Sequence, residues 1–422
     1  MKLAIVPDCH LNRSVYKGVM DREYFDLPFR SADFMRSFKW IVDECINNLH
    51  PDLFIIPGDV YENFEPSNLI TGFLSSQLRK LMNAKIPVII LVGNHDVCRK
   101  HHALKSLKEL DLKGVKVIEQ PKILEHTEFG VKFLLFPYSM DIEQNKISIK
   151  DAFNKFVKEI KEKDNGMPSI FFGHFGVRGG TLNEYEDGDE DGILDGILTD
   201  TTTTKDKKAY VNLNPKDIGL DDLDSIGAEY VFLGDYHRFQ VLPTKKCIAM
   251  YPGSIEKSDL TEVDQKKGFV LYDSEAKPQG NMGKCQFIEY PHCRPMKELR
   301  GNIDQIRKQF LDIDASKYRE SIIKITFEGN SDELFAFSTG LENLKKQIKE
   351  KINPIHLFHV QKTIDTDMEK AAGKIEQEIM AKGHMADEDV IEVVKEMLVE
   401  TIKDQEECQK TVDLAVEIYR EE

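Results

Sequence analysis

Five short motifs, each following an apolar run, carry the side chains that could do chemistry. They are Asp8-Cys9-His10, Gly58-Asp59, Gly93-Asn94-His95-Asp96, Gly173-His174 and Gly234-Asp235-Tyr236-His237. Carboxylate, imidazole and amide groups together suit Mn²⁺, Fe²⁺ or Zn²⁺. A shared carboxylate can bridge two such ions about 3.5–4 Å apart, and the pair then activates water and neutralises charge on a phosphate. The motifs therefore indicate two-metal hydrolysis of a phosphoester.

No single motif is specific. An Asp-x-His or a Gly-Asp pair is commonly an ordinary turn, and a lone His174 would more often be a core or surface histidine. The glycines let the backbone turn sharply and approach a ligand closely. Sites in open α/β sheets assemble beyond the carboxyl ends of strands, so loops far apart in the chain can meet there. The five motifs in order, each after a predicted strand, make the prediction strong.

The elements that must position these motifs alternate in the first hundred residues. Apolar strands are predicted at 3–6, 52–57 and 88–92, and helices at 34–49 and 69–82. This alternation indicates βαβ units and a largely parallel sheet. Further strands at 133–136, 169–172, 230–233, 247–251 and 268–272 suggest a second sheet. We expect residues 1–275 to form an α/β domain with two sheets.

Two further regions are expected. A boundary near 274–282 precedes a strand–helix–strand–helix–strand pattern, which predicts a smaller α/β cap domain at 282–362 that shapes access for a substrate. Residues 365–422 read as acidic helices with two apolar faces. Those faces favour docking on a partner protein, because their negative charge would repel DNA. The alternative is that they pack back on this chain.

Composition and charge limit the possibilities. The chain has 422 residues, 41% of them hydrophobic, and no apolar run long enough to span a bilayer. Seven cysteines without CxxC spacing indicate reduced thiols and a cytoplasmic location. The net charge of −16 is concentrated in 365–422 and in the acidic stretch 184–200, and the remainder carries about +3. A polyanionic substrate is therefore not excluded.

Residues 179–208, which include the whole of that acidic stretch, are rich in Gly, Asp and Thr and read as a flexible insertion. Asp187, Asp189 and Asp191 have the spacing that opens a calcium-binding loop. Leu198 occupies the position where that loop requires glutamate, so a solvated acidic loop is the simpler interpretation.

At this point the ordered motifs resemble those of the calcineurin-like metallophosphoesterases. Four more segments resemble the SbcD-type DNA-repair nucleases, which include phage recombination endonuclease subunits: 58–62 with Pro66-Ser67, 251–256, 267–269 and Arg294-Pro295. The similarity runs with gaps over about residues 1–300. It implies an α/β/β/α sandwich and an Mn²⁺-dependent DNA exonuclease and single-strand endonuclease. It further implies a homodimer within a heterotetramer, whose C-terminal helices dock on an SbcC-type coiled-coil ATPase, in a bacterial or phage-infected cytoplasm.

The resemblance also assigns roles. Asp8, His10, Asp59 and His237 would hold one metal ion, with Asp59 bridging to a second ion held by Asn94, His174 and Asp235. His95 would be the general acid or charge stabiliser, oriented by Asp96. Arg99 and Lys100, directly after this loop, are expected to touch DNA phosphate. Glu62 is near enough in sequence to line the site, with its role open.

One position departs from the family pattern. The family commonly has histidine where this chain has Asp235, which lowers the charge of the loaded site from about +2 to about +1 and shifts preference toward harder ions. The alternative is that Asp235 is a turn residue beside a loosely held second ion.

Two other functions remain open. One is a phosphatase or phosphodiesterase of small phosphoesters, for which the cap and C-terminal helices are superfluous. The other is a non-catalytic scaffold, against which the intact motifs argue.

Overall fold

The computed structural model describes residues 1–16, 19–24, 26–98, 100–109, 112–185, 208–211, 218–329 and 331–363. Arg99, most of the acidic insertion and the segment 365–422 lie outside the described residues, so the structure says nothing about the predictions made for them. The chain divides into two compact units between Pro295 and Met296.

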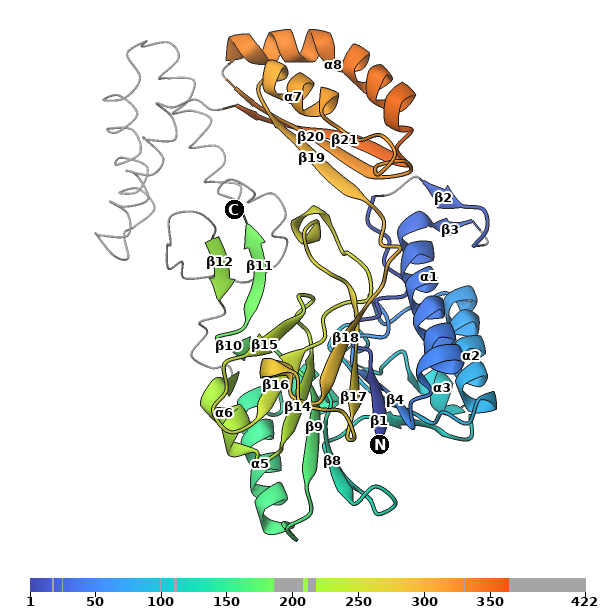
Figure 1. The fold of residues 1–422 in the computed structure, drawn as a ribbon, viewed down its shortest axis with the longest axis vertical. Coiled ribbons are helices and arrows are strands. Elements are labelled where there is room, and N and C mark those ends of the chain that lie inside the picture. The colour runs from blue at the N-terminus through green and yellow to red at the C-terminus, as the bar shows by residue number, and fades with distance from the viewer. Residues whose placement is uncertain are drawn as a thin grey trace, which may run out of the picture. The chain divides into compact units, whose positions relative to one another are not determined.

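The first unit is built on two six-stranded sheets. The first sheet has the order β18–β17–β1–β4–β5–β6, with its four adjacent strands β1, β4, β5 and β6 parallel and β17 and β18 antiparallel. Its strands are β1 Lys2–Ile5, β4 Leu53–Pro57, β5 Val88–Leu91, β6 Val115–Ile118, β17 Gly268–Asp273 and β18 Cys285–Glu289. The outer face of this first sheet is covered by α1 (Phe29–Glu44) and α2 (Asn68–Asn83), the blue helices of Figure 1.

The second sheet has the order β15–β16–β14–β9–β8–β7. Its strands are β7 Lys122–His126, β8 Val131–Phe136, β9 Ser169–His174, β14 Tyr230–Gly234, β15 Gln240–Leu242 and β16 Ile248–Tyr251. The four central strands are parallel, and the edge strands β7 and β15 pair antiparallel. Helices α5 (Ile149–Glu162) and α6 (Leu220–Ser225) cover its outer face.

Side-chain alternation along the strands explains the layers. In β1, Leu3 and Ile5 point into a core shared with the second sheet, whereas Ala4 packs against the helices of the first. In β8, Phe133 points to that same shared core and Leu134 toward α5. Strands with apolar residues on both faces are buried on both sides. The result is the α/β/β/α sandwich that the resemblance implied.

Shorter elements connect these layers. They are β2 Met20–Asp21, β3 Leu27–Pro28, α3 Lys105–Glu109, α4 Met140–Glu143, β10 Val177–Arg178, β11 Thr181–Tyr185, β12 Lys208–Val211 and β13 Ile218–Gly219. Strands β11 and β12 pair antiparallel, so the two described ends of the predicted flexible insertion are a strand pair.

The second unit is a parallel three-stranded sheet with helices on one face. It contains β19 Met296–Gly301, α7 Ile303–Leu311, β20 Ile322–Gly329, α8 Ser331–Ile352 and β21 His356–Thr363. Asn302 caps α7, because its Oδ1 accepts from Gln305 N at 3.0 Å while Gln305 Oε1 accepts from Asn302 N at 2.9 Å. The core lies between this sheet and the two helices.

The predicted domain boundary is corrected by the pairing of β18. The sequence pattern assigned this strand to the cap domain, but it pairs with β17 along its whole length and belongs to the first sheet. The first unit therefore extends to Pro295 rather than to residue 275. The first strand of the second unit is β19, whose charged sequence Met-Lys-Glu-Leu-Arg-Gly gave no apolar signal.

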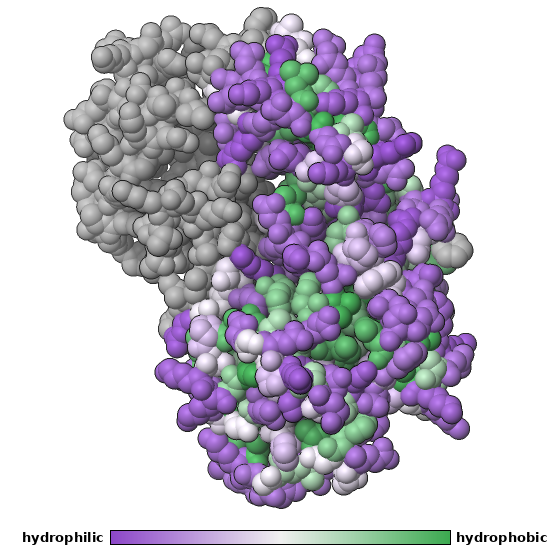
Figure 2. All heavy atoms as spheres, viewed as in Figure 1, coloured by the Kyte–Doolittle hydropathy of each residue, from purple (hydrophilic) through white to green (hydrophobic). Residues whose placement is uncertain are grey.

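The surface of the described residues is mainly hydrophilic on the face shown in Figure 2, with apolar groups scattered between polar ones. Large hydrophobic side chains exposed among these residues are Met20, Leu69 and Leu311. Within the described ranges, no helix is both long and apolar enough to cross a membrane.

Candidate metal centre

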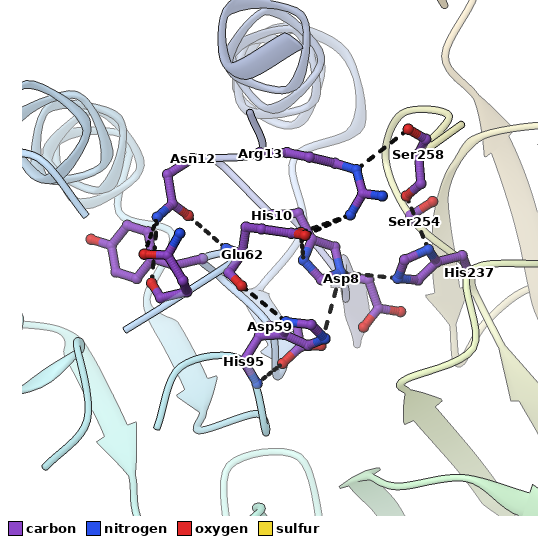
Figure 3. Close-up of polar contacts among 12 residues, drawn as sticks. Asp8, His10, Asn12, Arg13, Asp59, Glu62, His95, His237, Ser254 and Ser258 are labelled. Atoms are coloured by element: carbon purple, nitrogen blue, oxygen red, sulfur yellow. Dashed lines mark hydrogen bonds and ion pairs between the residues drawn. The ribbon is translucent and has the colours of Figure 1, made fainter. Parts of the chain in front are cut away.

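The carboxyl ends of the parallel strands bring all five motifs to one edge of the sandwich. Asp8 follows β1, Asp59 follows β4, and Asn94 with His95 follows β5. From the second sheet, His174 ends β9 and Asp235 directly follows β14. Figure 3 shows the loops of the first sheet and the loop carrying His237 meeting around Asp8 and His10. The structure thus places the five motifs close together.

Asp59 lies between two histidines. Its Oδ2 is 3.8 Å from His10 Nε2, and its Oδ1 is 3.2 Å from His174 Nε2. His10 Nε2 in turn lies 3.0 Å from His237 Nε2, and His174 Nε2 lies 2.7 Å from Asn94 Oδ1. The two oxygens of one carboxylate thus face two separate groups of nitrogen and oxygen donors.

The imidazoles of His10, His174 and His237 each have Nδ1 beside a carboxylate or carbonyl oxygen and Nε2 toward the other possible ligands. His237 Nδ1 is 3.0 Å from Glu262 Oε1, and His174 Nδ1 is 2.8 Å from the carbonyl of Pro57. His10 Nδ1 lies 2.9 Å from Glu62 Oε2, a close contact that is poorly aligned for a hydrogen bond. When a carboxylate or carbonyl accepts from Nδ1–H, the Nε2 lone pair is free for a metal ion. All three Nε2 atoms point inward.

Buried negative charge makes a divalent cation a good fit. The ligand atoms of Asp8, His10 and Asp59 lie within 4.8 Å of one another, and all three residues are buried. Asp8 Oδ2 is buried without a hydrogen-bond partner among the described residues. Burial raises the pKa of Asp8 to about 7, against the lowering effect of His174 and His237. Hard oxygen and imidazole donors of this kind suit Mn²⁺ or a similar ion.

His174 and Asp59 each favour the charged form of the other. Burial alone would lower the pKa of His174, but Asp59, Asp8 and Asp235 together raise it to about 10. For Asp59, burial would raise the pKa, but His174, His95 and His10 together lower it. Positive charge is therefore strongly favoured at this point of the site.

The backbone is strained at the same residues. Asp8, His10, Asp59 and Asp235 have φ values of 51°, 40°, 50° and 104°. Left-handed conformations are uncommon in residues other than glycine and cluster at functional sites. Gly234 permits the approach of the sheets, because a Cβ there would lie 2.3 Å from the Pro57 carbonyl and 2.6 Å from His174 Nδ1.

His95 differs from these histidines. Its side chain is exposed, and its Nδ1 lies 2.9 Å from the carbonyl oxygen of Glu62. Its backbone N–H donates to Asp59 Oδ1 at 3.0 Å. An exposed ring beside a buried site is placed to meet a substrate. The ligand atoms of His95, His10 and Glu62 also lie within 4.8 Å of one another, which makes them a second group that could hold an ion.

Among the described residues, no hydrogen bond joins the Asp96 carboxylate to the His95 ring, so its predicted role in orienting His95 stays a prediction. The Asp96 carboxylate is buried and accepts from the backbone N–H groups of Tyr61 and Gly93 at 3.0 Å each, and of Val60 at 3.3 Å. It ties the loop after β4 to the loop after β5. Any influence of Asp96 on His95 therefore passes through the backbone.

Asp235 is only partly brought into the cluster. Its N–H donates to Asp8 Oδ1 at 3.0 Å, and burial raises the pKa of its carboxyl group. Its carboxylate is not part of either group of three possible ligands found within 4.8 Å among the described residues. Lys100 is exposed, and Arg99 lies outside the described residues.

Three residues of the site escaped the sequence motifs. Lys267 is fully buried, pairs with Glu262 at 2.8 Å and donates to the carbonyl of His237 at 2.9 Å. Arg13 forms two 2.8 Å contacts with the carboxylate of Glu62. Glu262 follows no strand and has no motif spacing, so only the fold reveals it. Lys267 lay within a segment that resembled the SbcD-type nucleases, which was the one signal in the sequence.

Comparison with known proteins agrees with this geometry. Residues 1–199 match the calcineurin-like phosphoesterase family. Together with the two-sheet fold and the ligand cluster, this match shows that the chain contains a calcineurin-like phosphoesterase domain.

Individual relatives show which members of this family the chain resembles. The chain is 25% identical over 278 residues to the SbcD component of the nuclease SbcCD of Staphylococcus epidermidis, covering 62% of this chain and 65% of that protein. It is 30% identical over 133 residues to the DNA double-strand break repair protein Mre11 of Sulfurisphaera tokodaii, covering 30% of this chain and 31% of that protein. Against Mre11 of Archaeoglobus fulgidus it is 28% identical over 120 residues, covering 28% and 25%. The chain thus spans less than two thirds of the length of each of these relatives. Their similarity supports the resemblance to the SbcD-type nucleases.

Proposed function

We propose that this chain is a DNA nuclease that uses two divalent ions, and that it acts as the hydrolytic subunit of an SbcCD-type complex for processing DNA ends. The observation that carries the proposal is Asp59, whose two carboxylate oxygens face His10 and His174 separately. That arrangement suits one bridging ligand between two ion positions. Asp8 and His237 would complete the first position, and Asn94, His174 and Asp235 the second.

The ions, when bound, would polarise the phosphate and lower the pKa of a water molecule. The chain's own residues would hold and orient the substrate. His95 is exposed at the site, and its Nδ1–H donates to the Glu62 carbonyl. Nε2 of the neutral ring can then accept a hydrogen bond, and in the doubly protonated ring it can donate a proton or a hydrogen bond to the substrate. Arg99 and Lys100 follow in the same loop and would contact the phosphate backbone.

DNA is favoured over small phosphoesters as the substrate. The relatives are named as a nuclease component and as DNA double-strand break repair proteins. A phosphatase of small molecules would not need the second unit of β19–β21 with α7 and α8. Exonuclease and single-strand endonuclease activity, regulated by ATP, are the activities that we assign. Mn²⁺ is the ion expected, because Asp235 replaces a softer imidazole donor.

The expected partner is an SbcC-type coiled-coil ATPase, bound by residues 365–422, in a heterotetramer containing two copies of this chain. The SbcCD name of the bacterial relative and the apolar stripes of that segment support this assignment. Deleting residues 385–422 should abolish binding to the base of the ATPase coiled coil, measured by fluorescence anisotropy, while Mn²⁺ binding remains. Unchanged ATPase affinity in the shortened chain would refute the docking assignment.

The activity is tested with purified protein on end-labelled duplex DNA, circular single-stranded DNA and p-nitrophenyl phosphate esters, with and without Mn²⁺. We expect Mn²⁺-dependent cleavage of both DNA substrates and much slower hydrolysis of the esters. The variant Asp59→Asn provides the matched control for contaminating nucleases. Faster turnover of the monoester than of DNA would favour the small-molecule phosphatase, and no turnover of any substrate would favour a scaffold.

A further inference from the structure

Glu62 contacts two functional histidines through different atoms. Its carboxylate oxygen Oε2 lies 2.9 Å from His10 Nδ1, and its main-chain carbonyl lies 2.9 Å from His95 Nδ1. Its own N–H donates to Asn12 Oδ1 at 2.6 Å, which fixes the backbone at this point. A predicted metal ligand and a predicted catalytic histidine are therefore held by one residue (Figure 3).

Arg13 holds the other side of the Glu62 carboxylate. Its guanidinium lies 2.8 Å from each of the two carboxylate oxygens, while its Nε donates to the carbonyl of Ser258 at 3.4 Å. The Ser258 hydroxyl lies 3.0 Å from His237 Nδ1. A continuous chain of contacts thus runs from His95 through Glu62 and Arg13 to His237, linking the loops after β4 and β5 to the loop after β14.

The chemistry of these contacts favours metal binding. A carboxylate that accepts from Nδ1–H fixes the imidazole tautomer with Nε2 as the metal ligand and makes Nε2 more basic. The Glu62 carboxylate lies within reach of His10 Nδ1, although the two are poorly aligned in the structure. Arg13 pairs with the Glu62 carboxylate, and a hydrogen bond between charged groups is stronger than one between neutral groups. The Glu62 side chain is only 23% exposed, so solvent competes weakly for these contacts.

We infer that Glu62 and Arg13 are a positioning pair, which sets the His10 imidazole for the first metal ion and the His95 ring for the substrate phosphate. The inference rests on the metal centre of the proposed function, and not on DNA being the substrate. The ligand atom of Glu62 lies within 4.8 Å of those of His10 and His95, but the proposal gives Glu62 a positioning role and not that of a ligand. Glu62 acts through His10 and His95, and Arg13 acts through Glu62 and Ser258.

The test is a calorimetric titration of Mn²⁺ into the metal-free full-length chain. Glu62→Gln keeps the shape of the side chain but replaces a charged carboxylate, which has two acceptor oxygens, with a neutral amide that has one. A single oxygen is then left to accept from both the Arg13 guanidinium and His10 Nδ1. Partners of metal-ligating histidines typically change metal affinity about 10–100-fold. We expect a loss of that size for Glu62→Gln, and a partial recovery in Glu62→Asp, which restores the carboxylate.

Matched controls separate positioning from folding. Glu65→Gln changes an exposed glutamate in the same loop and should bind Mn²⁺ as the wild type does. Thermal unfolding in EDTA should be nearly the same for the wild type and Glu62→Gln. After loading with Co²⁺, the visible absorption spectrum of Glu62→Gln should differ from that of the wild type, because the orientation of the His10 ligand changes.

Wild-type Mn²⁺ affinity in Glu62→Gln would overturn the inference. It would also be overturned by a variant that loses affinity, unfolds at clearly lower temperature in EDTA and is not rescued in Glu62→Asp, since that pattern is a folding defect. The proposed function fails differently, through a wild-type chain that binds Mn²⁺ normally and leaves DNA uncut.

Discussion

The two halves of the metal centre differ in the groups that lie beside the Nδ1 atoms of their histidines. In the half formed by Asp8, His10 and His237, the Nδ1 atoms of both histidines face carboxylates, those of Glu62 and Glu262. In the other half, His174 Nδ1 lies 2.8 Å from the neutral carbonyl of Pro57, and Asp8 Oδ1 is further away at 3.9 Å. Asn94 offers a neutral oxygen there, and Asp235 lies outside the tightest groups of described ligands.

This difference predicts which half of the centre has the higher affinity for its metal ion. Carboxylate partners make imidazole ligands more basic, and buried, mutually bonded partners keep them from rotating away. The half with His10 and His237 has both features, so we expect it to bind its ion more tightly than the half with His174. Asp59 contributes to both halves and should matter to both.

The largest expected effect is at Asp59. Asp59→Asn removes the carboxylate that faces both His10 and His174, so it should abolish high-affinity binding in both halves together. Cleavage should fall further than the roughly 10²–10⁴-fold expected for loss of an acid–base group. Elemental analysis after gel filtration in Mn²⁺ would measure the ions retained, and end-labelled DNA would report cleavage. Retention of one tightly bound ion would show that the halves are independent of Asp59.

A separate effect is expected at His95, whose Nδ1 lies 2.9 Å from the Glu62 carbonyl and whose ring packs edge-on against that of His10, with 5.2 Å between the ring centroids. His95→Gln should retain both ions and bind DNA normally, yet cleave it about 10²–10⁴-fold more slowly. Mn²⁺ calorimetry and single-turnover cleavage on the same preparation provide the two readouts. If His95→Gln loses an ion as Asp59→Asn does, His95 is a ligand and its assigned role is wrong.

The contrast between the halves also explains what the sequence could predict. Asp8, Asp59, Asn94 and His174 follow apolar strands, so alternation of strands and helices placed them at one edge in advance. Glu262 lies in a loop more than two hundred residues from Asp59 in the chain, and its contact with His237 depends on the path of the backbone after β16. Periodicity carries no information about such a path.

The misplaced domain boundary has a similar cause. The segment at 274–282 has the composition of a linker, but β18 returns to pair with β17 and completes the first sheet. Antiparallel return of a strand after a polar turn looks the same in sequence as the start of a new domain. Only the pairing of Val270 with Phe287 and of their neighbours distinguishes the two.

A smaller effect should sharpen the comparison at Asp235. Asp235→His exchanges an anionic oxygen for a neutral nitrogen, so the half with His174 should bind Zn²⁺ relatively better and Mn²⁺ relatively less well. The stronger of two Mn²⁺ binding phases in calorimetry should be unchanged, because His10 and His237 keep their carboxylate partners. Identical binding isotherms for Asp235→His and the wild type would indicate that Asp235 is a turn residue.

The smallest effect is expected at Lys100, which should affect neither half. Lys100 is exposed, and its predicted contact is with one backbone phosphate. Lys100→Ala should therefore leave both Mn²⁺ affinities unchanged and weaken DNA binding similarly for different sequences. A single lost phosphate contact lowers the slope of log affinity against log salt by about 1. Anisotropy titrations of labelled DNA at several salt concentrations, in Ca²⁺ to suppress cleavage, would measure that slope. Lys105→Ala, a change at an exposed lysine slightly further along the chain, is the matched control. An unchanged slope in Lys100→Ala, or equal changes in the two variants, would remove Lys100 from the DNA-binding surface and leave the phosphate to be held by the metal centre alone.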